Sequence, residues 1–159
     1  IAKETQTMKK HGVRLNAIGN LAQLPSRAVK YLKKCMDDTA MNTKCTLTLA
    51  LSYSSRWEIV DAAKSLAQSA LDGDIKIDDI DEHMFSQRLN SYPLPDPELM
   101  IRTSGEQRIS NYLLWQLAYA ELYFTNKLWP DFRRDDLYEA ILSYQNRERR
   151  FGLTSEQIK

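Results

Sequence analysis

The sequence predicts an α/β fold in which a mostly parallel sheet carries helices on both of its faces. Strand-like segments alternate along the chain with segments of helical periodicity, and one short strand in the last third is wholly apolar. Such alternation is typical of parallel sheets, because consecutive parallel strands are joined by a crossover helix. A wholly apolar strand is typical of a sheet that is covered on both faces.

The first half of the chain predicts two strands with a helix between them. Apolar and polar residues alternate over residues 13–17, which predicts a short strand that ends at the turn of Gly19. They alternate again over residues 45–53, with large groups on one face, which predicts a central strand. Helix-start signals at Pro25 and Ser26 precede three apolar residues at helical spacing: Val29, Leu32 and Met36. The lysines beside them are interpreted as the solvated face of this helix: Lys30, Lys33 and Lys34.

The middle of the chain predicts a pair of helices and then an extended loop. Ser55 and Glu58 have the spacing of a capping box, which predicts a helix that ends near Gly73. Residues 75–79 are expected to form a loop, and a second helix is expected over residues 81–89. Prolines then impose an extended loop: Pro93, Pro95 and Pro97.

The last third of the chain predicts two more strands and two more helices. Residues 99–101 predict the buried apolar strand, which ends at Arg102. Residues 110–120 are rich in leucine and aromatic side chains, and they predict a helix that is buried on nearly all sides. Residues 121–125 predict a further strand, and a final helix is expected before the charged run of residues 147–150.

The length, charge and cysteine content exclude several classes of protein. A chain of 159 residues with 43% hydrophobic residues favours one domain with its own core. The formal net charge is +1, so no overall field attracts DNA or RNA, and no nucleic-acid partner is expected. Cys35 and Cys45 are too few for a disulfide framework and are interpreted as reduced core residues. No segment approaches the ~20 apolar residues of a bilayer span, so we expect a cytoplasmic protein.

The segment that follows the apolar strand is the strongest candidate for a binding site. Ligands of open α/β sheets bind beyond the carboxyl ends of the strands, and this segment carries guanidinium groups, hydroxyls and a glycine turn before a predicted helix. Arg102 and Arg108 are suited to phosphate oxygens, and Ser110 is suited to donate from the helix start. An equally favoured interpretation is that the arginines pair with Glu106 and Glu121 as an ion network.

Glu121 lies where the apolar helix is expected to end and a strand to begin. A solitary carboxylate is costly there unless it is paired or binds a cation. Mg²⁺ fits, because it usually takes one or two protein carboxylates and completes its coordination with water and substrate phosphate oxygens. A salt bridge to one of the arginines is an equal alternative.

Other polar motifs carry weaker signals. His11 and His83 have no second ligand at helical spacing, which disfavours a metal or catalytic role. Residues 129–132 predict a packed turn, in which Asp131 either caps the turn or joins the site. The arginines of residues 147–150 are interpreted as a solvated helix end. The sequence contains no Walker loop, dinucleotide fingerprint or Ser-His-Asp arrangement.

Three blocks of the sequence together resemble the signature of the cis-prenyltransferases. These blocks are residues 101–116, 118–124 and 128–132. The similarity to the bacterial undecaprenyl diphosphate synthases of that family extends from residues 12–14 to residues 146–152, which covers nearly the whole chain. A match of this length is a specific signal.

The resemblance implies a homodimeric α/β enzyme that requires Mg²⁺. Such an enzyme condenses isopentenyl diphosphate, in cis geometry, onto farnesyl diphosphate. It makes the lipid carrier for cell-wall synthesis and contacts the inner membrane transiently through that product. Carried over by position, the resemblance implies four residues that hold isopentenyl diphosphate: Arg102, Arg108, Ile109 and Ser110. It implies that Glu121 ligates Mg²⁺, either in trans or beside the phosphates, with supporting roles for Glu106, Asn111 and Asp131.

The sequence departs from the family pattern at three places. Residues 52–55 read Ser-Tyr-Ser-Ser where the family has Asn-Tyr-Gly-Gly, and Gln107 replaces a histidine of some members. The family's opening strand, its Gly-Asn-Gly-Arg loop with the catalytic aspartate and its Phe-Ser-Xaa-Glu-Asn motif have no counterpart here. Residues 1–10 resemble the end of the helix that should follow them. We therefore expect residues 1–159 to be a single catalytic domain that is incomplete at its N-terminus.

Two functions fit this pattern. The first is a transferase whose N-terminal part is missing, so that the 159-residue chain alone is inactive. The second is a noncatalytic partner subunit that keeps the dimer-forming half and lacks the allylic diphosphate site. The enzyme is favoured, because the residues of the isopentenyl side are retained and Ile1 is not a natural start. The sequence does not predict the chain length of the product.

Overall fold

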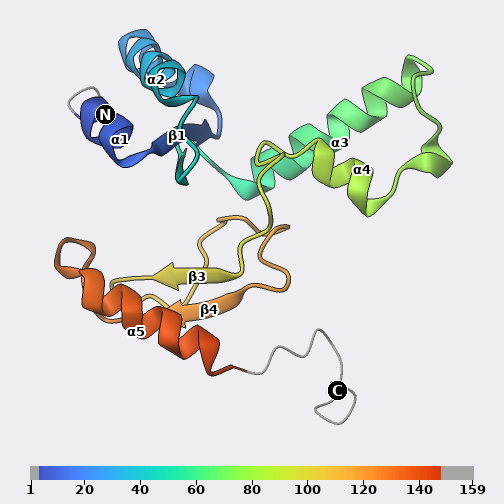
Figure 1. Ribbon diagram of the computed structural model, residues 1–159. Coiled ribbons are helices and arrows are strands. Elements are labelled where there is room, and N and C mark those ends of the chain that lie inside the picture. The colour runs from blue at the N-terminus through green and yellow to red at the C-terminus, as the bar shows by residue number, and fades with distance from the viewer. Residues whose placement is uncertain (1–3, 148–159) are drawn as a thin grey trace. The chain divides into compact units, whose positions relative to one another are not determined.

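The computed structural model describes residues 4–147, which form two compact units (Figure 1). The first unit runs up to Leu94 and the second begins at Pro95. Each unit contains its own pair of parallel strands together with helices. The α/β class and the parallel strands are therefore confirmed, whereas the single domain stays a prediction.

Two parallel strands and two helices form the first part of the first unit. The strands pair in register from Val13 opposite Cys45 to Ile18 opposite Ala50. Both helices contact the first strand, and a short 3-10 helix, η1, follows it. The bounds are α1 Thr5–His11, β1 Val13–Ile18, η1 Leu21–Gln23, α2 Ser26–Thr39 and β2 Cys45–Ala50. The strands and the helix predicted for this region are thus confirmed.

The core of this region lies between α2 and the strands. Leu15, Leu32 and Cys35 pack together there, and each is 2% exposed or less. The buried hydroxyl of Thr39 accepts a hydrogen bond from the Leu15 amide at 3.0 Å, which ties the end of α2 to β1. Cys35 is a free, buried thiol, as predicted.

Cys45 is exposed, so the prediction that it is a core residue is wrong. Among the described residues β2 pairs with β1 alone, and the first three residues of β2 are exposed. The strand predicted to be central therefore has a free edge in the part of the chain that the structure describes. Alternating large side chains predicted the strand correctly, but they do not show which of its positions are covered.

The turn after β1 requires a glycine. Gly19 has a φ of +110°, and a Cβ at this position would lie 2.1 Å from the carbonyl oxygen of Leu51. Any other residue would clash with that backbone and adopt an unfavourable conformation. The turn predicted at Gly19 is confirmed.

Two further helices and a short 3-10 helix complete the first unit. They lie close to the predicted positions, except that the 3-10 helix falls inside the predicted loop of residues 75–79. Asp81 caps the last helix by accepting a hydrogen bond from the Met84 amide at 2.7 Å. The bounds are α3 Ser55–Leu71, η2 Ile77–Asp79 and α4 Glu82–Gln87.

The capping box predicted from Ser55 and Glu58 is wrong by one residue. Ser54 is the N-cap of α3, and its hydroxyl accepts a hydrogen bond from the Trp57 amide at 3.3 Å. Glu58 is instead turned inward, is 1% exposed and accepts a hydrogen bond from the Tyr53 hydroxyl. The position of Glu58 three residues after Ser55 favoured the wrong one of two adjacent serines.

The second unit consists of a parallel strand pair with a helix packed against it (Figure 1). The strands pair in register from Leu99 opposite Glu121 to Arg102 opposite Phe124. The last helix contacts the second strand of this pair. The bounds are β3 Leu99–Arg102, β4 Glu121–Phe124, the 3-10 helix η3 Trp129–Asp131 and α5 Arg134–Gln145. Both predicted strands and the final helix are confirmed, while residues 148–150 of the charged run lie outside the described residues.

The helix predicted over residues 110–120 is not formed, and this segment is a succession of turns. Ser110, Asn111 and Leu113 have positive φ angles of 47°, 61° and 48°, which no right-handed helix contains. An all-round apolar helix depends on packing more than on intrinsic propensity. Gln116 and Leu117 of this segment are buried but Tyr112 and Tyr119 are exposed, so the described residues cover only part of its surface.

The turn predicted at residues 129–132 is present as η3, but it is not packed into the core. Trp129 is exposed and stacks on Phe132, with ring centroids 6.2 Å apart and an interplanar angle of 12°. The aromatic residues of this turn therefore contact each other rather than a core.

Candidate functional site

A polar hollow of about 380 Å³ lies at the carboxyl end of β3. Parallel sheets bind their ligands at this end of the strands. The hollow is lined by the end of β3 and by the turns that follow it: Met100, Ile101, Arg102, Thr103, Ser104, Ile109, Ser110 and Tyr112. It brings together three of the four residues that the sequence assigned to a diphosphate.

Arg102 and Ser110 are in direct contact in this hollow. The Nη1 atom of Arg102 donates a hydrogen bond to the Ser110 hydroxyl oxygen at 3.0 Å. Arg102 is the last residue of β3, and Ser110 is reached through the turns that begin after it. Because a guanidinium carries five N–H donors, this contact leaves the arginine able to bind an anion as well.

The turn after Arg102 is held by the chain that leaves β4. The amide of Ser104 donates to the Lys127 carbonyl at 2.7 Å, and the amide of Gly105 donates to the Thr125 carbonyl at 2.9 Å. Gly105 has a φ of +70°, which favours glycine. The glycine turn predicted here is therefore present and fixes the wall of the hollow.

No helix N-terminus contributes to this hollow. The interpretation of the sequence placed Ser110 at the start of a helix, where free amides and the helix dipole would favour an anion. Ser110 instead has a φ of +47° and lies in a turn. An anion in this hollow would therefore be bound by guanidinium and hydroxyl groups, without a helix dipole.

Arg108 does not line the hollow in this structure. Its Nη1 atom forms an ion pair with Oε2 of Glu106, and both side chains are exposed. One of the two ion pairs considered in the sequence is thus formed. Exposed pairs of this kind contribute little to stability, about 0–1 kcal/mol, so Arg108 can exchange Glu106 for another anion at small cost.

Glu121 pairs with an arginine that the sequence did not single out as its partner. Arg147 Nη1 donates to Glu121 Oε2 at 2.8 Å and to the Leu122 carbonyl at 3.0 Å. The expected salt bridge is present, but Arg147 supplies it rather than Arg102 or Arg108. Glu121 is opposite Leu99 at the amino end of the strand pair, which separates it from the polar hollow at the carboxyl end.

A single carboxylate at this position is compatible with Mg²⁺. Residues 4–147 contain no group of three or more His, Cys, Asp or Glu side chains that could hold a metal ion by themselves. Mg²⁺ does not need such a group, because it takes one or two carboxylates and obtains its other oxygens from water and substrate phosphates. Glu121 therefore fits as one ligand of a metal that arrives with a diphosphate.

Asp131 and Asn111 do not reach the lining of the hollow. Asp131 is exposed in η3, where its amide donates to the Leu128 carbonyl at 2.9 Å. Asn111 follows Ser110 with a φ of +61°. Their supporting roles stay predictions.

Tyr112 is a lining residue that sequence reasoning missed. Tyr112 is 41% exposed, and the partial burial of its side chain raises the pKa of its phenol above the ordinary value of 10.0. Tyr112 thus adds a phenol group, which is protonated at neutral pH and can donate or accept a hydrogen bond, to the lining of the hollow. Its position inside a predicted all-apolar helix concealed it, because that prediction assigned every aromatic residue of the segment to the core.

A further ion pair joins Lys127 and Asp136, outside the predicted site. Lys127 Nζ pairs with Asp136 Oδ1, and the Arg133 amide donates to Asp136 Oδ2 at 2.7 Å. The hydrogen bond from Lys127, then that from Arg133, lowers the pKa of Asp136, and the bond to Asp136 raises the pKa of Lys127. This pair links the segment after β4 to the first turn of α5.

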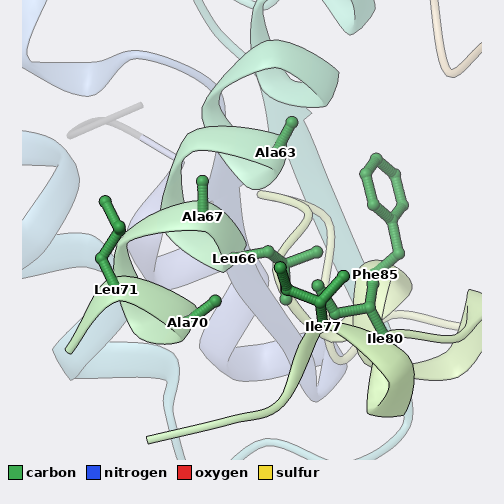
Figure 2. Close-up of a pocket in the computed structure, with 8 residues that line it drawn as sticks. All are labelled: Ala63, Leu66, Ala67, Ala70, Leu71, Ile77, Ile80 and Phe85. Atoms are coloured by element: carbon green, nitrogen blue, oxygen red, sulfur yellow. The ribbon is translucent and has the colours of Figure 1, made fainter. Parts of the chain in front are cut away.

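An apolar groove of about 580 Å³ lies between α3 and α4 (Figure 2). Figure 2 shows its eight lining side chains, none of which is charged or polar: Ala63, Leu66, Ala67, Ala70, Leu71, Ile77, Ile80 and Phe85. Leu71 and Ile77 at its rim are 83% and 75% exposed. The groove is unsuited to a diphosphate and suited to an apolar partner.

None of the helices within residues 4–147 has both the length and the hydropathy that crossing a bilayer requires.

Comparison with known proteins gives a consistent result. Residues 1–152 match the model of a family described as "Putative undecaprenyl diphosphate synthase". An isoprenyl transferase of Porphyromonas gingivalis is 50% identical over 158 residues, which is 99% of this chain and 62% of that protein. A ditrans,polycis-undecaprenyl-diphosphate synthase of Vibrio parahaemolyticus, named as specific for (2E,6E)-farnesyl diphosphate, is 43% identical over 159 residues, which is 100% of this chain and 63% of that protein.

The fold is also similar to that of a solved structure. Lavandulyl diphosphate synthase from Lavandula x intermedia, in complex with dimethylallyl diphosphate, matches with a TM-score of 0.89 and 38% identity. The match covers 95% of this chain and 64% of that one. This chain spans about three fifths of the length of the curated relatives that it matches.

Proposed function

The chain belongs to the undecaprenyl diphosphate synthase family of prenyltransferases, and from this we propose that it carries the isopentenyl diphosphate side of a cis-prenyltransferase active site. In the proposed reaction, isopentenyl diphosphate condenses in cis onto an allylic diphosphate, farnesyl diphosphate. Repeated condensation gives a polyprenyl diphosphate lipid carrier, undecaprenyl diphosphate.

The observation that carries this proposal is the contact between Arg102 and Ser110 in the polar hollow. The guanidinium and the hydroxyl lie 3.0 Å apart at the carboxyl end of β3. A diphosphate bound there would receive charge-assisted hydrogen bonds from Arg102, and each such bond contributes about 1.5–3 kcal/mol. Ser110 fixes the direction of the guanidinium and adds its own hydroxyl donor.

Arg108 is proposed to join when the diphosphate binds. In the structure its guanidinium is neutralised by Glu106, and both side chains are exposed. A diphosphate carries more negative charge than a carboxylate and offers oxygens at the spacing of a guanidinium fork. Glu106 would then serve as a placeholder that keeps Arg108 near the hollow before substrate arrives.

In the proposed reaction, Arg102, Arg108 and Ser110 position the nucleophile and stabilise the charge of the diphosphate. The bond between the allylic carbon and its diphosphate oxygen breaks, the double bond of isopentenyl diphosphate forms the new carbon–carbon bond, and a proton is lost. Arg102, Arg108 and Ser110 would hold the isopentenyl diphosphate, so that its double bond is kept beside the allylic carbon. They take part in no covalent step.

Glu121 is proposed to hold Mg²⁺. When bound, the metal would neutralise diphosphate charge. The Glu121–Arg147 pair is partly exposed, so exchanging the arginine for a cation carries a small cost. Because Glu121 is not beside Arg102, we favour a role for it that is separate from holding the isopentenyl diphosphate.

The whole protein is proposed to be a cytoplasmic homodimer that contacts the inner membrane transiently through its lipid product. The exposed apolar groove between α3 and α4 supports the homodimer, since contiguous exposed apolar surface marks interaction sites. A second copy of the chain would cover Leu71 and Ile77, which are otherwise largely exposed to solvent.

Calorimetric titration of isopentenyl diphosphate into the 159-residue chain tests the proposal. Arg102→Ala is expected to weaken binding at least about tenfold, because a lost charge-assisted contact exceeds 1.4 kcal/mol. Arg14→Ala, which removes an exposed arginine of β1, is the matched control and should bind as the wild type does. Equal affinity of the Arg102→Ala variant and the wild type would overturn the assignment.

A further inference from the structure

The outward face of α2 carries an uninterrupted basic ridge. Four cations follow one another between residues 26 and 36 without an intervening acidic residue, and all four are exposed. They recur at the spacing of neighbours on one side of a helix. The basic ridge consists of Arg27, Lys30, Lys33 and Lys34.

The opposite face of α2 is buried in the core of the first unit. Leu32, Cys35 and Thr39 are buried there against β1 and its neighbours. This helix therefore cannot insert an apolar face into another surface. Apart from Ala28 and Tyr31, the exposed residues in the first three turns of α2 are charged or carry a hydroxyl group.

Most of the charge on the ridge is not neutralised within the described residues. Lys34 pairs with Asp38 at 3.0 Å, but Arg27, Lys30 and Lys33 form no ion pair with any residue of the range 4–147. The acidic residues Asp37 and Asp38 lie in the last turn of α2. The positive surface is therefore confined to the first two turns.

A shallow pocket lies at the N-terminal end of the basic ridge. Ser26, Arg27, Lys30 and Tyr31 line a space of about 450 Å³. The guanidinium carbon of Arg27 lies 5.7 Å from the centroid of the Tyr31 ring, and Tyr31 is 45% exposed. Two cations and two hydroxyls around one hollow suit the phosphate ester of a lipid headgroup, and an exposed tyrosine suits a membrane–water interface.

We propose that the basic ridge docks the protein on a bilayer that contains anionic phospholipids. The proposal rests on the proposed function, because an enzyme that makes a lipid diphosphate must deliver it to a membrane. Anionic lipids attract basic residues within a Debye length of the surface, and each cation changes partitioning about fivefold. The ridge runs from Arg27 to Lys34 along α2, which at 1.5 Å per residue is about 10 Å of nearly straight helix that can lie against a planar surface. The lysines of α2, interpreted from the sequence as a merely solvated face, thereby become a binding surface.

Vesicle flotation tests this inference without substrate. The chain is mixed with vesicles of phosphatidylcholine alone or with about 30% phosphatidylglycerol, at low and at high salt. A triple variant, Arg27→Gln, Lys30→Gln and Lys33→Gln, removes three ridge charges and keeps good helix formers. The matched control removes three exposed cations elsewhere: Lys64→Gln, Lys76→Gln and Arg134→Gln.

The wild type and the control are expected to float with anionic vesicles only, and high salt should release them. The ridge variant should partition at least about twentyfold less, with an unchanged circular dichroism spectrum. Three results would overturn the inference: no flotation of the wild type at low salt, equal losses in both triple variants, or release by millimolar inorganic phosphate at constant ionic strength. Binding of isopentenyl diphosphate by the ridge variant reports on the proposed function separately.

Discussion

Arg102 and Glu121 lie at opposite ends and on opposite faces of the β3–β4 pair. Glu121 is opposite Leu99 at the amino end, and Arg102 is opposite Phe124 at the carboxyl end. Residues opposite each other share a face and side chains alternate, so a separation of three positions puts the two side chains on different faces. At about 3.3 Å per residue, their backbones are about 10 Å apart along the strand. The two charged residues that the sequence placed in one cluster therefore have separate environments.

This separation predicts that the two residues affect substrate binding differently. Glu121→Gln is expected to leave the affinity for isopentenyl diphosphate within about twofold of the wild type when no metal is present, while Arg102→Ala lowers it at least about tenfold. Added Mg²⁺ should change the affinity for isopentenyl diphosphate to the same extent in the wild type and in Glu121→Gln, because Glu121 lies at the other end of the strand pair. Calorimetric titrations with and without Mg²⁺ measure both effects. Equal loss of metal-free affinity in the two variants would show that both residues contact the same diphosphate.

The strands of this protein could be predicted from the sequence because their patterns are local. Alternation over residues 13–17 and the apolar run of residues 99–101 predicted β1 and β3 at nearly their observed bounds. The contact between Arg102 and Ser110 was also within reach, since both residues lie in the segment that follows a strand. Local patterns thus located the polar hollow.

The remaining errors concern features that depend on distant parts of the chain. The helix over residues 110–120 needs neighbours on every side, and its composition cannot show whether they are present. A pair of Glu121 with Arg102 or Arg108 was one of two equal alternatives, but α5 packs on β4 and brings Arg147 to Glu121 across 26 positions of sequence. The exposure of Cys45 likewise follows from which strands flank β2. Tertiary contacts determine whether this helix forms, which arginine pairs with Glu121 and whether Cys45 is buried. The local periodicity of a sequence carries no information about such contacts.

The buried carboxylate of Glu58 predicts a large loss of stability when it is removed. It accepts hydrogen bonds from the Tyr53 hydroxyl and, at 3.2 Å, from the backbone amide of Asn90. The side-chain oxygen of Asn90 in turn accepts a hydrogen bond from the backbone amide of Gly19. Glu58→Ala should lower the free energy of unfolding by about 3 kcal/mol, because two partly buried hydrogen bonds are lost and the buried side chain leaves a cavity.

Urea denaturation measures this loss, and Asp61→Ala on the exposed side of α3 provides the control. The control should change the free energy of unfolding by less than about 0.5 kcal/mol. If Glu58→Ala were as stable as Asp61→Ala, the hydrogen bonds that link the loops after β1 and β2 to α3 would have no structural role.

The ion pair of Lys127 and Asp136 predicts a stability that depends on pH at both extremes. The lowered pKa of Asp136 stabilises the fold above the ordinary aspartate value of 3.8, and this contribution is lost as the pH falls towards the folded-state pKa. The raised pKa of Lys127 has the opposite sign, so its contribution is present below 10.5 and is lost as the pH rises further. The difference in the free energy of unfolding between the wild type and Asp136→Asn should therefore stay constant from pH 7 to about pH 5 and narrow as the pH falls below about 4. Thermal unfolding from pH 7 to about pH 3 measures this difference, and a difference that stays constant throughout would show that the carboxylate form is not the stabilising one.

The apolar groove predicts that a charge at its rim prevents association of two chains. Leu71 and Ile77 are 83% and 75% exposed, and they border a groove lined by apolar side chains alone. In a homodimer that buries this groove, an aspartate at either position would bring an unpaired carboxylate into an apolar interface, which costs several kcal/mol. Leu71→Asp and Ile77→Asp should therefore shift the mass measured by light scattering from dimer to monomer, without a change in helical content. Val60→Asp is the matched control, since Val60 is an exposed apolar residue of the same helix outside the groove, and it should remain dimeric. Dimers that persist in both groove variants would place the interface elsewhere on the protein.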